Sequence, residues 1–447
     1  MAEIFPFAAW RYNPARVQWE NVLTQPYDKI TPEMQQRYAA LDAHNLIAVE
    51  KGIAQPNDTQ ANNVYTRAAA KLEEWSRAEI LVRDPAPAIY AYSQEFHLPG
   101  GRTRKVRRGF IALGRLEDFS AGVVFRHEQT LSAPKADRLE LLRLTRAQTG
   151  QLFMLYSDPA RRIDTLLAEA SRTPPATEMR DEYEVVHRLW PVTDHANIAR
   201  ISAAMAEQKI VIADGHHRYE TALAWRDECR AKLGASNPDA PWERAMMTFV
   251  NAQAEGLSIL PTHRVVANVP GFDFAAFRRV LEPHFDWYAY PFADAAERAS
   301  AWEDFRRDFL ARGKERRALG IYAGGVFYLF LLRADANLGD LLPGVSAAQR
   351  GLDVVLLHRF VLEEGLGITA AAVVAEKNIR YEREAEKALA AVDSGAAQMA
   401  FLLQPVRVEQ VFEIALGGEV LPQKSTDFYP KMLSGIAIYR QGLGNKD

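Results

Sequence analysis

The feature that most constrains this chain is a short apolar run that leads through a glycine directly into a helical pattern. The stretch KIVIADGHHRYETAL spans residues 209–223 and places one acid, one glycine, two histidines and one arginine in five consecutive positions. The run KIVIA is typical of a buried strand, and apolar residues recur at helical spacing after the glycine. Strands and helices alternate over much of the chain. The sequence therefore predicts a mixed α/β (α+β) fold with a polar turn at the start of one helix.

This turn has the chemistry of a phosphate site. A helix start offers backbone N–H groups and the positive end of the helix dipole. Gly215 lets the backbone approach a ligand, and Arg218 can fork onto phosphate oxygens, with His216 and His217 as further donors and candidate catalytic groups. Asp214 is predicted to hold a magnesium ion beside the phosphate and to take part in catalysis. The alternative is a structural turn in which Asp214 caps the helix.

The segment RHEQTLSAPKADR (126–138) supplies candidates for the acceptor side of a transfer reaction. Glu128 is the predicted base that orients or deprotonates a hydroxyl, and His127 competes for the same role. Three charged residues that follow are predicted to bind a phosphate or a substrate carboxylate: Lys135, Asp137 and Arg138. The alternative is an exposed, charged loop that leads into a helix.

Two stretches near the C-terminus also have anion-binding composition. In LPQKSTDFYPKMLSG (421–435) the predicted phosphate ligands are Lys424, Ser425, Thr426 and Lys431. LPTHR (260–264) contributes His263 and Arg264 as predicted substrate-binding residues. A structured turn is the alternative for both stretches. The basic stretch GRTRKVRRG (101–109) lies between two strand patterns and is interpreted as a solvated hairpin tip, with an anion-binding loop as the alternative.

Length and composition limit the other possibilities. A chain of 447 residues exceeds what one core usually organises, so we predict two regions, 1–235 and 243–447, around a turn-rich segment. The net charge of −3 gives no global attraction to nucleic acid. Cys229 is the single cysteine, which excludes an intramolecular disulfide and a cysteine-based zinc site. No apolar run approaches a membrane span, and we expect a cytoplasmic protein. The oligomeric state stays open.

Several of these motifs together resemble one known family. ADGHHRYETAL is similar to the hallmark of a prokaryotic family, domain of unknown function family 1015. Further stretches of the chain match the same family: QPYDKI (25–30), RHEQT (126–130), ADRLELL (136–142), LPTHR (260–264) and PQKSTDFYPKMLSG (422–435). The chain is therefore identified as a member of that family, whose name supplies no reaction.

The DGHHR box is also similar to the nucleotide-binding box of the ParB and sulfiredoxin superfamily, in which the equivalent turn binds nucleotide phosphates. This resemblance implies a ParB/sulfiredoxin-like nucleotide-binding core, with a C-terminal α/β region that closes over it. Sulfiredoxins need a cysteine in the box, and here His216 stands in that place, which argues against sulfinic acid reduction.

Free-serine kinases of this superfamily carry a similar box and use a glutamate upstream of it. Their likeness implies a kinase that uses ATP or ADP, with CTP as a further alternative, and Mg²⁺ to phosphorylate a small hydroxyl substrate. Free L-serine is the first candidate acceptor. A ParB-like nucleotide-binding or hydrolysing switch without an acceptor is the main alternative. A nucleic-acid-binding module is the other, and the acidic charge balance argues against it.

Overall fold

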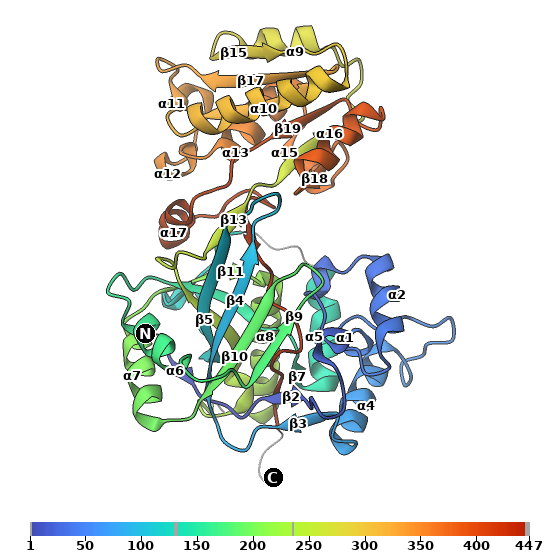
Figure 1. Cartoon of the computed structure of the whole chain (residues 1–447), viewed down its shortest axis with the longest axis vertical. Helices are drawn as coiled ribbons and strands as arrows, with labels where there is room; N and C mark the ends of the chain where they lie inside the picture. Colours follow the sequence, from blue (N-terminus) through green and yellow to red (C-terminus); the bar gives the residue numbers. More distant parts are fainter. Residues whose placement is uncertain (1, 129–132, 235–236, 443–447) are drawn as a thin grey trace. The chain divides into compact units, whose positions relative to one another are not determined.

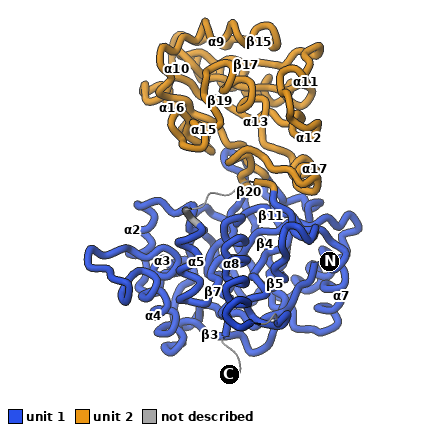
Figure 2. Tube along the Cα trace, turned by 180° about the vertical axis from the view of Figure 1, so that it is seen from behind, with its two compact units in different colours: residues 1–126, 130–258, 429–447 blue, residues 127–129, 259–428 orange. Residues whose placement is uncertain are grey.

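The computed structural model describes residues 2–128, 133–234 and 237–442 of the chain, which form two compact units (Figure 2). Unit 1 contains residues 1–126, 130–258 and 429–447, and unit 2 contains residues 127–129 and 259–428. The chain thus returns to unit 1 for its last residues. The predicted division into regions 1–235 and 243–447 stays a prediction.

Unit 1 is built on a mixed sheet that has nine strands in the described residues (Figure 1). Its order is β6-β11-β8-β12-β5-β4-β10-β9, and β1 pairs with β5. The strands are β1 (Ile4–Phe5), β4 (Ile89–His97), β5 (Arg104–Arg115), β6 (Val124–Phe125), β8 (Leu152–Tyr156), β9 (Thr177–Arg180), β10 (Val186–Val192), β11 (Ile210–Asp214) and β12 (Arg244–Asn251). β11 runs parallel to β6 and β12 parallel to β8, while the other pairs are antiparallel.

Helices cover this sheet and pack into its core. The helices of unit 1 are α1 (Trp19–Val22), α2 (Pro32–Leu41), α3 (Ile47–Glu50), α4 (Val64–Arg77), α5 (Ala133–Thr145), α6 (Arg162–Ala170), α7 (His195–Ala206) and α8 (His216–Leu233). Apolar residues of α6, α7 and α8 join strand residues such as Met154, Ile212 and Phe249 in one buried cluster. Two small antiparallel pairs complete the unit: β2 (Trp10–Tyr12) with β3 (Leu81–Arg83), and β7 (Ala147–Gln148) with β21 (Tyr439–Arg440).

Unit 2 has its own antiparallel sheet and core. Its strand order is β15-β17-β16-β19-β14-β18. The strands are β14 (His263–Val266), β15 (Phe285–Tyr290), β16 (Ala318–Ala323), β17 (Val326–Leu332), β18 (Ile379–Glu382) and β19 (Met399–Leu402). The helices are α9 (Phe274–Leu281), α10 (Ala295–Arg312), α11 (Leu338–Leu341), α12 (Ala347–Arg350), α13 (Asp353–Leu356), α14 (Glu363–Leu366), α15 (Ala370–Val374), α16 (Ala385–Asp393) and α17 (Val408–Leu416). Phe305, Phe327 and Leu329 are among the fully buried residues that join α10 to this sheet.

The mixed α/β class predicted from the sequence is confirmed by both sheets. The predicted strand at residues 209–213 is β11, and the predicted helix after it is α8. The predicted hairpin is confirmed, because β4 and β5 pair antiparallel and residues 101–104 are exposed. The predicted solvated stretch extends too far, since β5 begins at Arg104 and Arg107 is only 1% exposed. Within the described chain, no helix has both the length and the apolar character needed to cross a lipid bilayer.

Candidate functional site

The DGHHR box forms the junction between a strand and a helix in unit 1. β11 ends at Asp214, where a register shift against β8 marks an irregularity in the ladder. Gly215 follows with a φ of +94° and is the N-cap of α8. A Cβ at this position would lie 3.0 Å from Nη2 of Arg218 and from Leu152. Both the backbone angle and the close approach therefore require glycine.

Gly215, and not Asp214, is the N-cap residue of α8. Because glycine has no side chain, the N-cap residue supplies no capping hydrogen bond of its own, and a cap by the Asp214 carboxylate stays the structural alternative. The first helical hydrogen bond runs from the Tyr219 amide to the Gly215 carbonyl. His216 is buried and His217 is partly buried in the first turn. The helix start therefore keeps the backbone geometry that suits an anion.

Two cations lie beside the one carboxylate of the box. Nη2 of Arg218 is 3.8 Å from Oδ2 of Asp214, and Nζ of Lys431 is 3.9 Å from the same oxygen. Both separations are longer than a hydrogen bond. Arg218 is held by its other terminal nitrogen, which donates to the Gln151 carbonyl over 2.6 Å. The three side chains carry a net positive charge at a helix start, and this combination attracts an anion.

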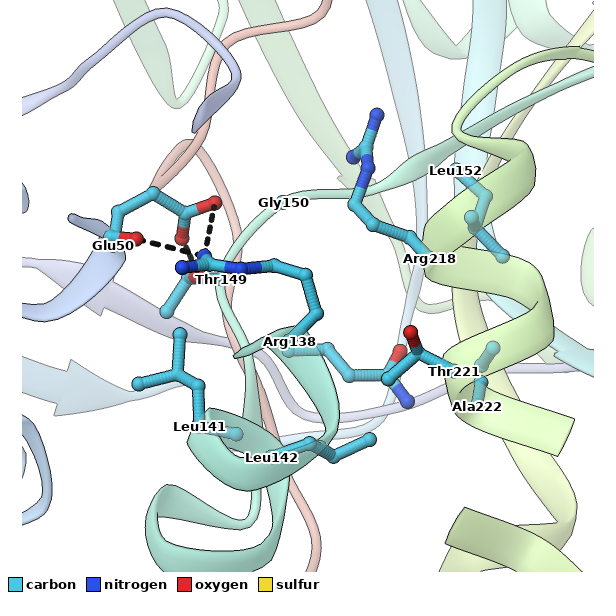
Figure 3. A pocket seen from close by; sticks show the side chains of 13 residues that line it. Glu50, Arg138, Leu141, Leu142, Thr149, Gly150, Leu152, Arg218, Thr221 and Ala222 are labelled. Atoms are coloured by element: carbon cyan, nitrogen blue, oxygen red, sulfur yellow. Dashed lines mark hydrogen bonds and ion pairs between the residues drawn. The ribbon is translucent and has the colours of Figure 1, made fainter. Parts of the chain in front are cut away.

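A small hollow opens beside Arg218, and Figure 3 shows Arg138 of α5 at its wall. Its volume is about 60 Å³. The wall is formed by Glu50, Arg138, Leu141, Leu142, Ala147, Gln148, Thr149, Gly150, Leu152, Arg218, Thr221, Ala222 and Ala245. Arg138 donates to the Glu50 carbonyl over 2.7 Å, and the Thr149 hydroxyl donates to the Glu50 carboxylate. The enclosed part of the hollow therefore has room for a group of a few atoms.

Tyr27 connects a further sequence motif to this place. The guanidinium of Arg138 stacks over the Tyr27 ring, 4.4 Å from its centre. Burial raises the pKa of Tyr27 to about 12, and the nearby charges of Arg218 and Arg138 oppose that rise. Three motifs that are far apart in the sequence therefore meet in unit 1: QPYDKI through Tyr27, ADRLELL through Arg138 and the DGHHR box through Arg218.

The other charged residues predicted on α5 pair with protein groups. Lys135 forms an ion pair with Glu220 of α8. Asp137 pairs with Arg138 over 2.6 Å and accepts a hydrogen bond from the Tyr65 hydroxyl over 2.8 Å. These contacts tie α5 to α8 and α4. Roles of Lys135 and Asp137 in substrate binding stay predictions.

Glu128 and His127 belong to unit 2, where they hold the KST stretch. Oε1 of Glu128 accepts a hydrogen bond from the Lys424 amide over 2.8 Å, and Lys424 has a positive φ of 56°. Nε2 of His127 is 2.8 Å from the Thr426 hydroxyl. The Ser425 hydroxyl donates to the Pro422 carbonyl. Glu128 and His127 thus contact Lys424 and Thr426 of the KST stretch. The catalytic roles of the first two residues and the phosphate-binding roles of the KST residues stay predictions. Residues 129–132 of the same motif lie outside the described residues.

His263 and Arg264 are buried in unit 2. Burial lowers the pKa of His263 to about 4, so its ring is neutral, and Nδ1 accepts a hydrogen bond from the Leu403 amide over 3.2 Å. Arg264 donates to the Gln423 and Lys424 carbonyls over 3.3 and 3.2 Å, and its Nε lies 3.3 Å from Nε2 of His358. These bonds suit the structural alternative, and substrate binding by the two residues stays a prediction.

Sequence reasoning missed Arg107 as an individual residue. Its guanidinium is fully buried in unit 1 and donates to the Tyr429 and Pro430 carbonyls and to Gln94. Burial lowers the pKa of Arg107 to about 10, and the charge of Asp214 partly offsets that effect. The sequence signal for the burial of Arg107 is the alternation of side chains along β5, which places residue 107 on the same face of the strand as the buried Ile111.

The carboxylate of Asp214 fits magnesium in one limited sense. In the part of the chain that the structure describes, no group of three or more histidine, cysteine, aspartate or glutamate residues could enclose a metal ion. Mg²⁺ is commonly held by one or two carboxylates together with phosphate oxygens and water. A magnesium ion on Asp214, completed by phosphate oxygens and water, stays a prediction.

Comparison with known proteins places the chain in a family. The sequence profile described as "Protein of unknown function (DUF1015)" matches residues 4–355. The chain belongs to this family. The match ends before PQKSTDFYPKMLSG, so it does not cover that motif. None of the curated proteins matches the sequence.

Several solved structures have a distant likeness to this chain. A conserved hypothetical protein from Pyrococcus furiosus has 15% identity and a TM-score of 0.33, with 70% of this chain and 91% of that chain covered. A free serine kinase variant in complex with ADP has 12% identity and a TM-score of 0.35, with coverages of 75% and 94%. A free serine kinase in complex with AMP has 14% identity and a TM-score of 0.33, with coverages of 70% and 89%. Likenesses this distant assign no activity to this chain.

Proposed function

We propose that this protein is a nucleotide- and magnesium-dependent phosphotransferase that acts on a small hydroxyl substrate. The observation that carries the proposal is the start of α8, where Gly215 adopts a positive φ and two cations lie within 4 Å of the Asp214 carboxylate. A helix start, a close backbone approach and two cationic side chains are the features that hold a terminal phosphate.

Each residue of the box has a distinct part in the proposal. The backbone at Gly215 and the side chains of Arg218 and Lys431 bind the phosphates, with His216 and His217 as further donors. Asp214 holds Mg²⁺, which would neutralise charge on the phosphate oxygens when bound. The resemblance of the box to nucleotide-binding turns favours ATP or ADP, and CTP is the further candidate.

The acceptor is proposed to be small because the hollow beside Arg218 is small. At about 60 Å³ it accepts a group of a few atoms, and Arg138 and Arg218 contribute positive charge to its wall. A short polar substrate with an anionic group suits it, and free L-serine is the first candidate. Glu128, with His127 as the competitor, remains the predicted base.

A nucleotide-driven switch is the second candidate, because the same box can bind phosphates without any acceptor. The two candidates differ in the product that they release. We would incubate the purified protein with Mg²⁺, a panel of ATP, ADP and CTP, and a pool of small hydroxy compounds that includes L-serine, and follow products by mass spectrometry. A phosphorylated acceptor is expected.

Two other results have clear meanings. Tight nucleotide binding without any phosphorylated acceptor would favour the switch. Absence of nucleotide binding by the folded protein would refute both candidates. Arg218→Ala, purified in the same way, controls for phosphotransfer by a contaminating enzyme. This variant should form less phosphorylated product because it binds nucleotide more weakly, whereas a contaminant would form the same amount in both samples.

A further inference from the structure

Gln94 and Arg107 form a buried pair in the sheet of unit 1. They are direct partners in the antiparallel register of β4 and β5, and each is only 1% exposed. Nε of Arg107 donates to Oε1 of Gln94 over 3.0 Å. The guanidinium lies over the ring of Phe153 in β8, 4.8 Å from its centre. The pair therefore lies in the close-packed interior of the unit.

The pair binds the backbone of a distant segment. Nη1 of Arg107 donates to the Tyr429 carbonyl over 3.3 Å, and Nη2 donates to the Pro430 carbonyl. Nε2 of Gln94 donates to the Lys431 carbonyl over 2.8 Å. Three consecutive carbonyl groups are thus held by two side chains. A guanidinium has five N–H donors and a carboxamide has two, so this pair has enough donors for the three carbonyls.

The third of these carbonyls belongs to Lys431 itself. The segment enters unit 1 again at residue 429, after the chain has passed through unit 2. Lys431 follows two residues after the end of the short strand β20 (Asp427–Tyr429). With its carbonyl held by Gln94, Lys431 reaches Asp214 with its ammonium group 3.9 Å from Oδ2 and its side chain 11% exposed.

We infer that Arg107 and Gln94 are positioning residues, which clamp residues 429–431 and thereby set Lys431 as the second cation of the phosphate site. The placement of Lys431 rests on the geometry alone. Its contact with a nucleotide phosphate rests on the proposed function. Neither Arg107 nor Gln94 touches the reacting atoms in this scheme, and both act through Lys431.

The clamp can be tested without any substrate. Reductive methylation with formaldehyde and a borohydride labels lysine ammonium groups, and peptide mass spectrometry gives the rate for each lysine. In the unchanged protein, Lys431 should react slowly because it is mostly buried next to a carboxylate. Gln94→Met removes the bond to the Lys431 carbonyl at similar side-chain volume, and the labelling rate of Lys431 should rise severalfold. Lys232, on the last turn of α8, should keep its rate.

Two further variants guard against a loss of folding. Arg107→Lys keeps a buried cation but loses the planar guanidinium, whose separate nitrogens reach the two carbonyls, so it should also raise the labelling of Lys431. Gln398→Met is the matched control, because Gln398 makes side-chain bonds to the backbone of Val269 in unit 2. It should leave Lys431 unchanged. If Lys431 labels at the original rate in folded Gln94→Met and Arg107→Lys, the clamp is refuted.

The phosphate role is tested separately by nucleotide titration. Lys431→Ala and Gln94→Met should each weaken nucleotide binding by about tenfold, the effect of one lost charge-assisted contact. The double variant should be no weaker than Lys431→Ala alone, because both changes remove the same interaction. Additive losses would refute the clamp's action through Lys431. If labelling of Lys431 rises in Gln94→Met but the unchanged protein binds no nucleotide, the clamp stands and the proposed function falls.

Discussion

Arg218→Ala is the sharpest test of the proposed phosphate site. The side chain is 14% exposed and makes one strong bond to the protein, from Nη1 to the Gln151 carbonyl over 2.6 Å. Its other terminal nitrogen lies on the side of Asp214. A hydrogen bond to a charged group contributes about 1.5 to 3 kcal/mol, so loss of the phosphate contact should weaken nucleotide binding by about 10- to 150-fold. The Gln151 carbonyl would also lose its partner, which costs roughly 1 to 3 kcal/mol of stability.

Calorimetric titration with nucleotide, together with thermal unfolding, separates these two effects. Arg230→Ala is the matched control, because Arg230 lies on the same helix about 18 Å from Arg218 and pairs with the buried Glu243. That control should lower stability and leave nucleotide affinity unchanged. Arg218→Lys should retain part of the affinity, since it keeps the charge and loses the fork. Unchanged affinity in folded Arg218→Ala would refute the assignment of the box.

Three further predictions address other groups. Gly215→Ala should lower the free energy of unfolding by about 1 to 3 kcal/mol and weaken nucleotide binding, because the new Cβ contacts Arg218 and Leu152 at a positive φ. Gly234→Ala is the control, since Gly234 ends α8 with φ +65° and has open space around it. In the same thermal scan this control should show only the cost of backbone strain. Glu128→Gln can still accept the hydrogen bond from the Lys424 amide, so it should slow turnover by about 10²- to 10⁴-fold at unchanged nucleotide affinity. His127→Asn is made in parallel to test the competing base. Full activity of Glu128→Gln together with an inactive Asp214→Asn would show that the base is another residue. Burial raises the pKa of Asp353 from 3.8 to about 7, so between these pH values the native state binds more protons than the unfolded state, and the free energy of unfolding falls by up to about 4 kcal/mol as pH rises from 3.8 to 7. Asp353→Asn should therefore raise the thermal stability of unit 2 at pH 8 and change it little near pH 4. Equal stability shifts at pH 4 and pH 8 would contradict this assignment.

The parts of the site that follow from short-range patterns were predictable from the sequence. β11 and α8 appear within a residue or two of where the apolar run and the helical spacing place them. Gly215 was chosen from the sequence because it lets the backbone approach a ligand, and the structure adds that its φ is +94°. Such features depend on neighbours within a few residues, and the sequence carries them directly.

Partners that are distant in the chain were not predictable in the same way. GRTRKVRRG contains five arginine and lysine residues, and composition does not tell which of them is buried. Arg107 is distinguished only by the strand period and by its register against Gln94. Likewise, Glu128 was chosen as a base for its chemistry, and only the fold shows that it accepts the amide of Lys424, almost 300 positions away.

In the motif PQKSTDFYPKMLSG, composition gave only part of the chemistry that the structure shows. Its lysines and hydroxyls suggested anion binding, but its backbone carbonyls are themselves ligands of buried cations. In unit 2, Arg264 binds the carbonyls of Gln423 and Lys424, and in unit 1, Arg107 binds those of Tyr429 and Pro430. Burial lowers the pKa of each arginine to about 10, so both remain charged at neutral pH. A buried charge is costly unless several hydrogen bonds compensate it, and a pair of adjacent carbonyls supplies them. Two kinds of contact therefore constrain the motif: the ion pair of Lys431 with Asp214, and the hydrogen bonds from Arg107 and Arg264 to its backbone carbonyls.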